Sequence, residues 1–227
     1  MSADEPRPPN APGKMRTWWH PLLVGLLDWE LGDAYEVRGE VNVGTAPLRA
    51  DIVLIRRESG ELPESARRDL RILVERLNRW TLIEFKGPTD ALDRFDLDRL
   101  LGVAYLFCSQ QPKPIRSSDL SLIVLAPRLN RPFRENLRVR GFSAHEEEPG
   151  VHRLEGLSFS AWIIETDRIT GPQEPILTLV SRTLLRDPRR IIEQIGARGH
   201  ASLLQYVLQQ VRQFDQLEEG FAMRRSD

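Results

Sequence analysis

The residues of the sequence that could do chemistry are two acids and a lysine that interrupt apolar segments. Asp51 lies within LRADIVLIRR, and Glu84 and Lys86 stand at the end of WTLIEFK. Residues i and i+2 of a strand share a face, so Glu84 and Lys86 should project together. Consecutive strands usually pair, which would bring Asp51 to the same point. The pattern predicts a cluster of two carboxylates and one ammonium.

Two neighbouring carboxylates repel each other unless a cation lies between them. Hard oxygen ligands with open positions suit Mg²⁺ or Mn²⁺, which keep waters and accept phosphate oxygens. The chain has 32 basic residues and only three are lysines, so Lys86 is an unusual choice. Its ammonium could reach an attacking water or the developing phosphorane charge, and the nearby metal cation together with partial burial could lower its pKa enough for a base. The predicted chemistry is metal-assisted hydrolysis of a phosphodiester.

A simpler interpretation assigns these residues to ordinary ion pairs. Glu84 and Lys86 would form a same-face salt bridge, and Asp51 would pair with Arg49 or Arg38 on its own polar face. Two separate ion pairs must then explain why charges interrupt the two most apolar strands, where unpaired ions are costly. A metal site explains both interruptions at once.

The periodicity of the sequence indicates the elements that must position this cluster. Alternating and apolar runs predict strands, and apolar spacings of three and four predict helices. Asp90, Asp93 and Asp96 should occupy the first turns of one helix, where carboxylates favour the dipole. Its buried stripe should include Leu92, Phe95, Leu100, Leu101, Ala104, Tyr105 and Phe107. The expected elements are a helix at 20–32, strands at 35–43 and 48–57, a helix inserted at 63–79, a strand at 80–85, a helix from about 90 to 107 and a strand at 120–127.

Beyond this β-α-β unit we expect a helix at 131–140, a hairpin at 142–156, a last strand at 159–167 and helices over 173–222. Residues 1–14 contain four prolines and should form a disordered tail. The predicted domains are therefore the tail at 1–14, a main domain at 15–170 and a C-terminal helical extension at 171–227.

The order of acids, lysine and elements resembles the PD-(D/E)xK nuclease superfamily, the fold of restriction endonucleases. The resemblance covers about residues 18–127, with Ala50 at the usual proline position and a long insertion before Glu84. It implies an α/β fold with an α-β-β-β-α-β core, that is, a mixed central sheet flanked by helices. It also implies that Asp51, Glu84 and the backbone carbonyl of Phe85 bind the metal, and that Lys86 handles the nucleophilic water. An additional acid would be Glu30 of the first helix, or Glu40 as its competitor.

The formal net charge of −1 gives no global signature of nucleic acid binding, so contacts must come from local patches. Residues 128–140 carry five Arg against one Glu, and residues 182–190 carry four Arg against one Asp. These segments are either solvated helix faces or phosphate contacts, and the candidates for contact are Arg128, Arg131, Arg134 and Arg138.

The expected protein is a Mg²⁺- or Mn²⁺-dependent nuclease that acts on DNA. The alternative is a catalytically inactive nuclease-like domain that binds nucleic acid or protein. No run approaches the roughly 18 apolar residues of a membrane span, and the single cysteine, Cys108, fits a reducing cytoplasm. Dimers are frequent among such nucleases, so a homodimer is one expectation.

Overall fold

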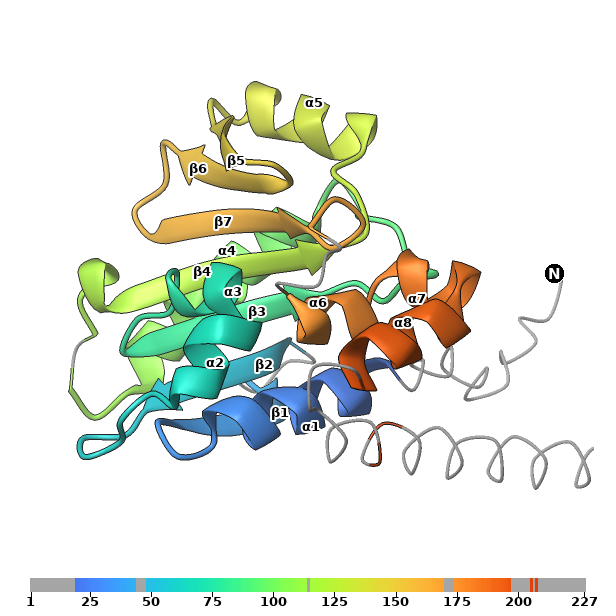
Figure 1. The fold of residues 1–227 in the computed structure, drawn as a ribbon. Helices are drawn as coiled ribbons and strands as arrows, with labels where there is room; N and C mark the ends of the chain where they lie inside the picture. The colour runs from blue at the N-terminus through green and yellow to red at the C-terminus, as the bar shows by residue number, and fades with distance from the viewer. Residues whose placement is uncertain are drawn as a thin grey trace, which may run out of the picture.

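The protein has an α/β fold built on a seven-stranded mixed sheet that helices flank (Figure 1). The computed structural model describes residues 19–43, 48–113, 115–169, 174–196, 205 and 207. The strand order is β1-β2-β3-β4-β7-β6-β5, in which β3, β4 and β7 run parallel and the other neighbours pair antiparallel. The strands are β1 (Tyr35–Asn42), β2 (Arg49–Arg56), β3 (Trp80–Phe85), β4 (Leu120–Ala126), β5 (Ser143–Glu148), β6 (Val151–Glu155) and β7 (Ser160–Glu165).

The first half of the chain follows the predicted order of elements. Helix α1 (Trp19–Leu31) precedes the antiparallel pair β1 and β2, and β3 follows after the insertion. Leucines of α1 at spacings of three and four are fully buried because this face packs on the sheet. The sequence-based prediction of these elements is confirmed. The predicted tail at 1–14 lies outside the described residues, as does most of the chain after 196.

The insertion between β2 and β3 differs from the expected single helix at 63–79, and that prediction is wrong. It contains two short helices, α2 (Glu64–Asp69) and α3 (Arg71–Val74), separated at Leu70, whose φ of −136° leaves the helical region. In a continuous helix the N–H of Ile72 would donate to the carbonyl of Arg68. It donates instead to the Glu174 carboxylate at 2.9 Å, so a contact from the far end of the chain interrupts the helix.

Helix α4 (Asp96–Gln110) joins β3 to the parallel strand β4 and completes the predicted β-α-β unit, with a short 3-10 helix at Ser117–Asp119 before β4. The helix begins about six residues later than expected. The Asp90 and Asp93 carboxylates accept hydrogen bonds from loop N–H groups of Gly87 and Phe95 instead of lying in a first helical turn. Phe95 and Tyr105 are exposed, contrary to the expected buried stripe.

The second half of the chain extends the sheet beyond β4. Helix α5 (Arg131–Val139) is followed by the predicted hairpin of β5 and β6, and β7 then lies between β6 and β4. The predicted helical C-terminal segment contains α6 (Pro175–Leu179), α7 (Arg182–Arg186) and α8 (Pro188–Gly196). No helix of the described segments has the length and apolarity required to cross a membrane.

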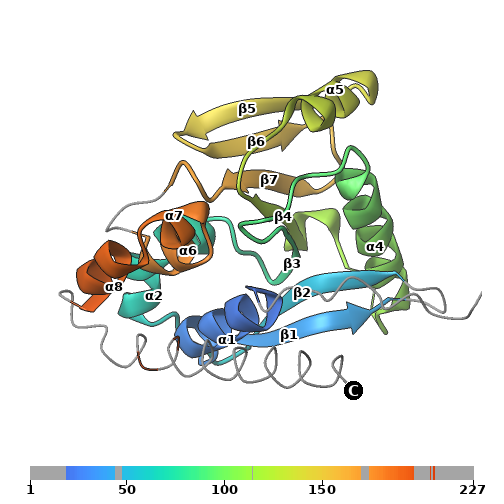
Figure 2. The same cartoon turned by 90° about the vertical axis from the view of Figure 1, so that its right-hand side faces the viewer.

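Helices cover both faces of the sheet, as the view in Figure 2 shows. One face packs against α1, α2, α3, α6 and α7, and the other packs against α4 and α5. Residues of β2 and β3 alternate between the two faces, so Ile52 and Ile83 belong to the first core and Val53 and Leu82 to the second. Both strands are therefore apolar on both sides, which makes a charge within them informative.

Candidate active site

Asp51 and Glu84 lie at the end of the β2–β3 pair, on the face that α4 covers. Ile52 of β2 pairs with Ile83 of β3 in an antiparallel register. The next pair of positions in this register is Asp51 and Glu84, so these two residues lie opposite each other. Asp51 is 5% exposed, and its Oδ2 accepts a hydrogen bond from the Phe85 N–H at 3.0 Å. The carboxylate thus takes a backbone donor of the next strand, which fixes its position beside Glu84.

Lys86 lies between two carboxylates. Its Nζ is 2.7 Å from Glu84 Oε1 and 2.9 Å from Asp96 Oδ1. Asp96 is fully buried at the start of α4. Its carboxylate also forms an ion pair with Arg99 and accepts a hydrogen bond from the Asp93 N–H. The first turn of α4 therefore positions the ammonium against Glu84, and a compact ammonium suits this site between two acids better than a planar guanidinium.

The charged groups of this cluster shift each other's pKa values. Burial, with the repulsion of Asp51 added to it, raises the pKa of Glu84 to about 7 although Lys86 opposes the rise. Burial lowers the pKa of Lys86, but Glu84 and Asp96 together outweigh burial, so that pKa lies above its usual value. Without a metal the pKa of Lys86 is therefore raised, because two carboxylates rather than one hold the ammonium, and the lowered pKa expected beside a bound cation stays a prediction.

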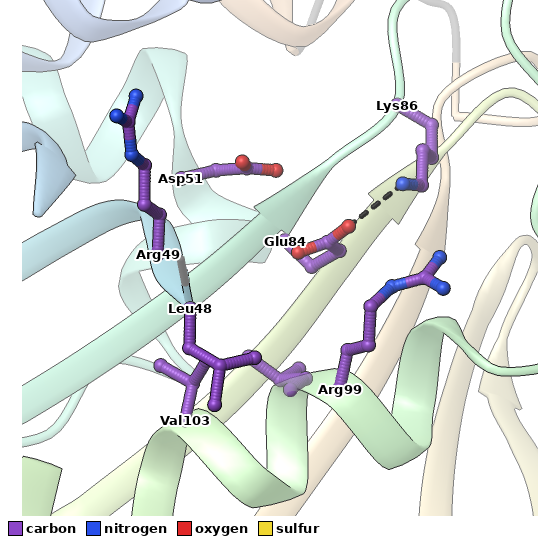
Figure 3. A pocket seen from close by; sticks show the side chains of 8 residues that line it. Leu48, Arg49, Asp51, Glu84, Lys86, Arg99 and Val103 are labelled. Carbon is purple, nitrogen blue, oxygen red and sulfur yellow. Dashed lines mark hydrogen bonds and ion pairs between the residues drawn. The ribbon is translucent and has the colours of Figure 1, made fainter. Parts of the chain in front are cut away.

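Asp51, Glu84 and Lys86 line two adjoining cavities. The first, of about 270 Å³, lies toward α4 and is completed by Leu48, Arg49, Arg99, Leu100 and Val103 (Figure 3). The second, of about 380 Å³, lies toward α1 and is completed by His20, Phe85, Thr89, Asp90 and Ala91. The three side chains thus stand where the two cavities meet, accessible to a ligand from both sides.

The second cavity depends on a loop that the C-terminal helices hold in place. Arg182 of α7 donates to the carbonyl of Pro88 at 2.7 Å and to that of Asp90 at 3.4 Å. A side chain at Gly87 would clash with Trp19, since a Cβ there would lie 2.9 Å from the Trp19 ring. The arginine-rich segment 182–190 therefore contributes at least one side chain that orders the loop rather than facing solvent.

His20 is a site residue that the sequence pattern did not indicate. Its Nε2 lies 3.4 Å from Asp51 Oδ2, and its ring meets the Phe85 ring edge-on with 5.1 Å between centroids. The residue is 8% exposed and lines the second cavity. Only the packing of α1 against the end of β3 brings it there, and no local spacing signals that contact. Asp96 was likewise predicted only as a helix-start residue.

The two candidates for an additional acid do not line the cavities. Glu30 is ten residues after His20, which separates them by about 15 Å along α1, and its charge acts on Arg68 of α2. Glu40 is exposed, has a positive φ of 49°, and lies 3.6 Å from Arg49. Glu40 is therefore near the rim of the first cavity through Arg49, whereas Glu30 lies elsewhere.

The four arginines proposed to contact nucleic acid do not surround the cavities either. Arg128 lies after β4 and is 3.6 Å from Asp167. Arg131, Arg134 and Arg138 are exposed on α5, which packs against β5 at the sheet edge opposite β1 (Figure 1). Of the two cavities described above, the first is lined by Arg49 and Arg99.

The acids of the cluster are the candidate ligands of the predicted metal ion. Among the described residues, no group of three or more His, Cys, Asp or Glu side chains is arranged to hold a metal. Two carboxylates are nevertheless adjacent, and their repulsion, together with burial, raises the pKa of Glu84. A divalent cation would relieve this repulsion, and Mg²⁺ commonly uses one or two carboxylates and keeps several waters. Asp51 and Glu84 are therefore the residues that could hold such an ion.

Comparisons with known proteins add no assignment, because no family model, no curated protein and no solved structure matches this chain.

Proposed function

We propose that the protein is a metal-dependent nuclease of the PD-(D/E)xK type, which hydrolyses phosphodiester bonds in DNA. One observation carries the proposal: Asp51 and Glu84 are opposite each other on adjacent strands, with the Lys86 ammonium 2.7 Å from Glu84, where two cavities meet. Such a group of acids and a cation beside a cavity is a candidate for catalysis rather than for stability.

The order of elements supports the same proposal. Helix α1, strands β1, β2 and β3, helix α4 and strand β4 follow in the order α-β-β-β-α-β that the resemblance implies. The α2–α3 insertion lies between β2 and β3 and leaves their antiparallel pairing intact. The long insertion is therefore compatible with a restriction-endonuclease-like core.

In this proposal Asp51, Glu84 and the Phe85 backbone carbonyl would hold Mg²⁺ or Mn²⁺. When bound, such an ion polarises the phosphate and lowers the pKa of a water. Lys86 would donate from Nζ to an oxygen that gains negative charge. Asp96 and Glu84 orient this ammonium. His20 and the Phe85 N–H hold Asp51 Oδ2, which directs the carboxylate.

A cleavage assay tests the proposal. The wild type and Asp51→Asn are incubated with supercoiled, linear and single-stranded DNA and with RNA, in Mg²⁺, Mn²⁺ or chelator. Asp69→Asn is a matched control, because Asp69 is as deeply buried but binds Arg68 on α2. We expect metal-dependent DNA cleavage that Asp51→Asn slows by about 100-fold or more and Asp69→Asn retains.

Two outcomes would contradict the proposal. One is cleavage by Asp51→Asn at the wild-type rate, and the other is the absence of cleavage of every substrate in both metals. Binding of nucleic acid without any cleavage would support the alternative, a nuclease-like domain without turnover.

A further inference from the structure

The two cavities beside the Asp51–Glu84–Lys86 cluster have opposite charge balances. The first adds Arg49 and Arg99 to the cluster, so its lining carries three cations and two acids. The second adds Asp90 and a histidine, so its lining carries one permanent cation and three acids. An anionic ligand is therefore favoured in the first cavity and disfavoured in the second.

Arg49 and Arg99 are placed to contact a ligand. Each side chain is 48% exposed, and Figure 3 shows them on opposite sides of Asp51 and Glu84. The Arg49 Nη1 lies 3.6 Å from Glu40 Oε2, which is longer than a hydrogen bond. Its planar group of donors matches the geometry of phosphate oxygens. Two such groups across one cavity suit a ligand with more than one anionic position.

The rest of the first cavity is apolar. Leu48 precedes β2, and Leu100 and Val103 project from α4. A small inorganic anion would make no use of this wall. A nucleic acid strand alternates charged phosphates with less polar sugars and bases, so it fits both the arginines and the wall.

We propose that the first cavity binds the backbone of one nucleic acid strand next to the phosphate that is cleaved. Arg49 and Arg99 contact phosphate oxygens, and Leu48, which is only partly buried, contacts the nucleoside between them. This inference rests on the proposed function, since the cleaved phosphate lies at Asp51, Glu84 and Lys86. It assigns strand binding to residues outside the arginine-rich segments 128–140 and 182–190.

Fluorescence anisotropy tests this site without any need for turnover. Labelled single-stranded DNA and RNA of one sequence are titrated with the wild type, Arg49→Gln and Arg99→Gln in chelator, at several salt concentrations. Arg153→Gln is the matched control, because Arg153 is similarly exposed and lies 3.8 Å from Glu147 on the other half of the sheet.

We expect the wild type to bind at least one of the two strands. Arg49→Gln should raise Kd about tenfold and reduce the slope of log K against log salt by about 1. Arg99→Gln should act in the same direction, Arg49→Lys should retain most of the affinity, and Arg153→Gln should bind like the wild type. Wild-type affinity of Arg49→Gln, or failure of the wild type to bind either strand, would overturn the inference.

The result separates this inference from the proposed function. Weaker binding by Arg49→Gln without cleavage by any form of the protein leaves the strand site standing and removes the nuclease. Metal-dependent cleavage together with unchanged binding by Arg49→Gln supports the nuclease and removes the strand site.

Discussion

Buried charged side chains gather on both halves of the sheet, in different surroundings. The cavity cluster, defined as Asp51, Glu84, Lys86 and Asp96, lies at β2, β3 and the start of α4. The Glu165 cluster, defined as His152, Glu165 and Arg168, lies at β6 and the end of β7. Asp51 and Glu165 are 5% and 3% exposed, so burial alone does not distinguish the two clusters.

The clusters differ in the balance of donors and acids. Glu165 accepts hydrogen bonds from His152 Nε2 at 2.8 Å, from the Leu129 N–H at 2.8 Å and from Arg168 at 3.0 Å. Burial raises the pKa of Glu165, but these three donors outweigh it, and that pKa lies below its usual value. Glu84 has Lys86 beside it and a second carboxylate opposite, and its pKa rises to about 7.

This difference is the one expected between a structural charge and a functional one. The Glu165 network satisfies its carboxylate and joins β6, β7 and the segment after β4. The cavity cluster keeps two acids adjacent at an opening, an arrangement that costs stability unless a ligand compensates it. The comparison therefore predicts that changes in the first cluster affect activity and changes in the second affect stability.

The largest expected effect follows from removing the cation of the cavity cluster. Lys86→Gln keeps a donor near Glu84 but removes the charge, so cleavage should fall by about 100-fold or more. Arg168→Gln removes the cation of the Glu165 cluster and should leave the cleavage rate within about threefold of the wild type, because Arg168 lines neither cavity. Initial cleavage rates in Mg²⁺ measure the effects of both substitutions. Equal losses of rate in the two variants would show that the two clusters do not differ in function.

Removing the acid of each cluster should have opposite consequences for stability. Glu165→Ala leaves His152, Arg168 and a backbone N–H without their acceptor and should lower the free energy of unfolding by about 3 to 5 kcal/mol. Glu84→Gln resembles the protonated acid that burial already favours, so at neutral pH it should raise this free energy by up to about 3 kcal/mol instead of lowering it. Urea unfolding in chelator measures the free energy of both variants. A loss of stability in Glu84→Gln would contradict this expectation.

The two acids should also give opposite dependences of stability on pH. The pKa of Glu84 is raised in the folded state. The contribution of Glu84 to stability is therefore fully present below about pH 4.5 and is lost as the pH rises through about 7. The wild type should therefore lose up to about 3 kcal/mol relative to Glu84→Gln over this window, without metal. The pKa of Glu165 is lowered, so its contribution is present above about 4.5 and is lost as pH falls through the folded pKa.

Unfolding free energies of the wild type, Glu84→Gln and Glu165→Gln across this pH range measure the difference. If the difference in unfolding free energy between the wild type and Glu84→Gln stayed constant from acidic to neutral pH, the pKa of the Glu84 carboxyl would not be raised.

A smaller effect is expected at Asp96, which acts through Lys86. Asp96→Asn weakens the hold on the Lys86 ammonium and should reduce kcat about tenfold. Asp98→Asn is the control on the same helix, since Asp98 pairs with Arg140 and not with Lys86. A rise in KM without a change in kcat would assign Asp96 to binding instead of positioning.

Much of the fold was predictable because its patterns are local. Alternation in YEVRGEVNV and the apolar run WTLIEF identify β1 and β3 directly. The single helix predicted at 63–79 was wrong, because a carboxylate about 100 residues further along the chain, Glu174, binds the Ile72 N–H. The late start of α4 has a similar cause, since Asp90 and Asp93 bind loop N–H groups where a helix dipole was expected to favour them.

The candidate site was predictable in part. Asp51, Glu84 and Lys86 stand out because charges interrupt apolar strands, and strand pairing brings them together. His20, Asp96 and Arg99 come from helices α1 and α4, and their approach depends on how these helices pack on the sheet. The sequence pattern of an ordinary helix start or helix face contains no sign of that contact.

We propose that the carboxylates of the cavity cluster, and not those of the Glu165 cluster, bind a divalent metal. Mn²⁺ binding measured by electron paramagnetic resonance, in the absence of nucleic acid, tests it for the wild type, Asp51→Asn, Glu84→Gln and Glu165→Gln. We expect the first two variants to bind Mn²⁺ at least about tenfold more weakly than the wild type, and Glu165→Gln to bind it equally well. Mn²⁺ binding by Asp51→Asn and Glu84→Gln with wild-type affinity would show that these carboxylates do not hold the metal.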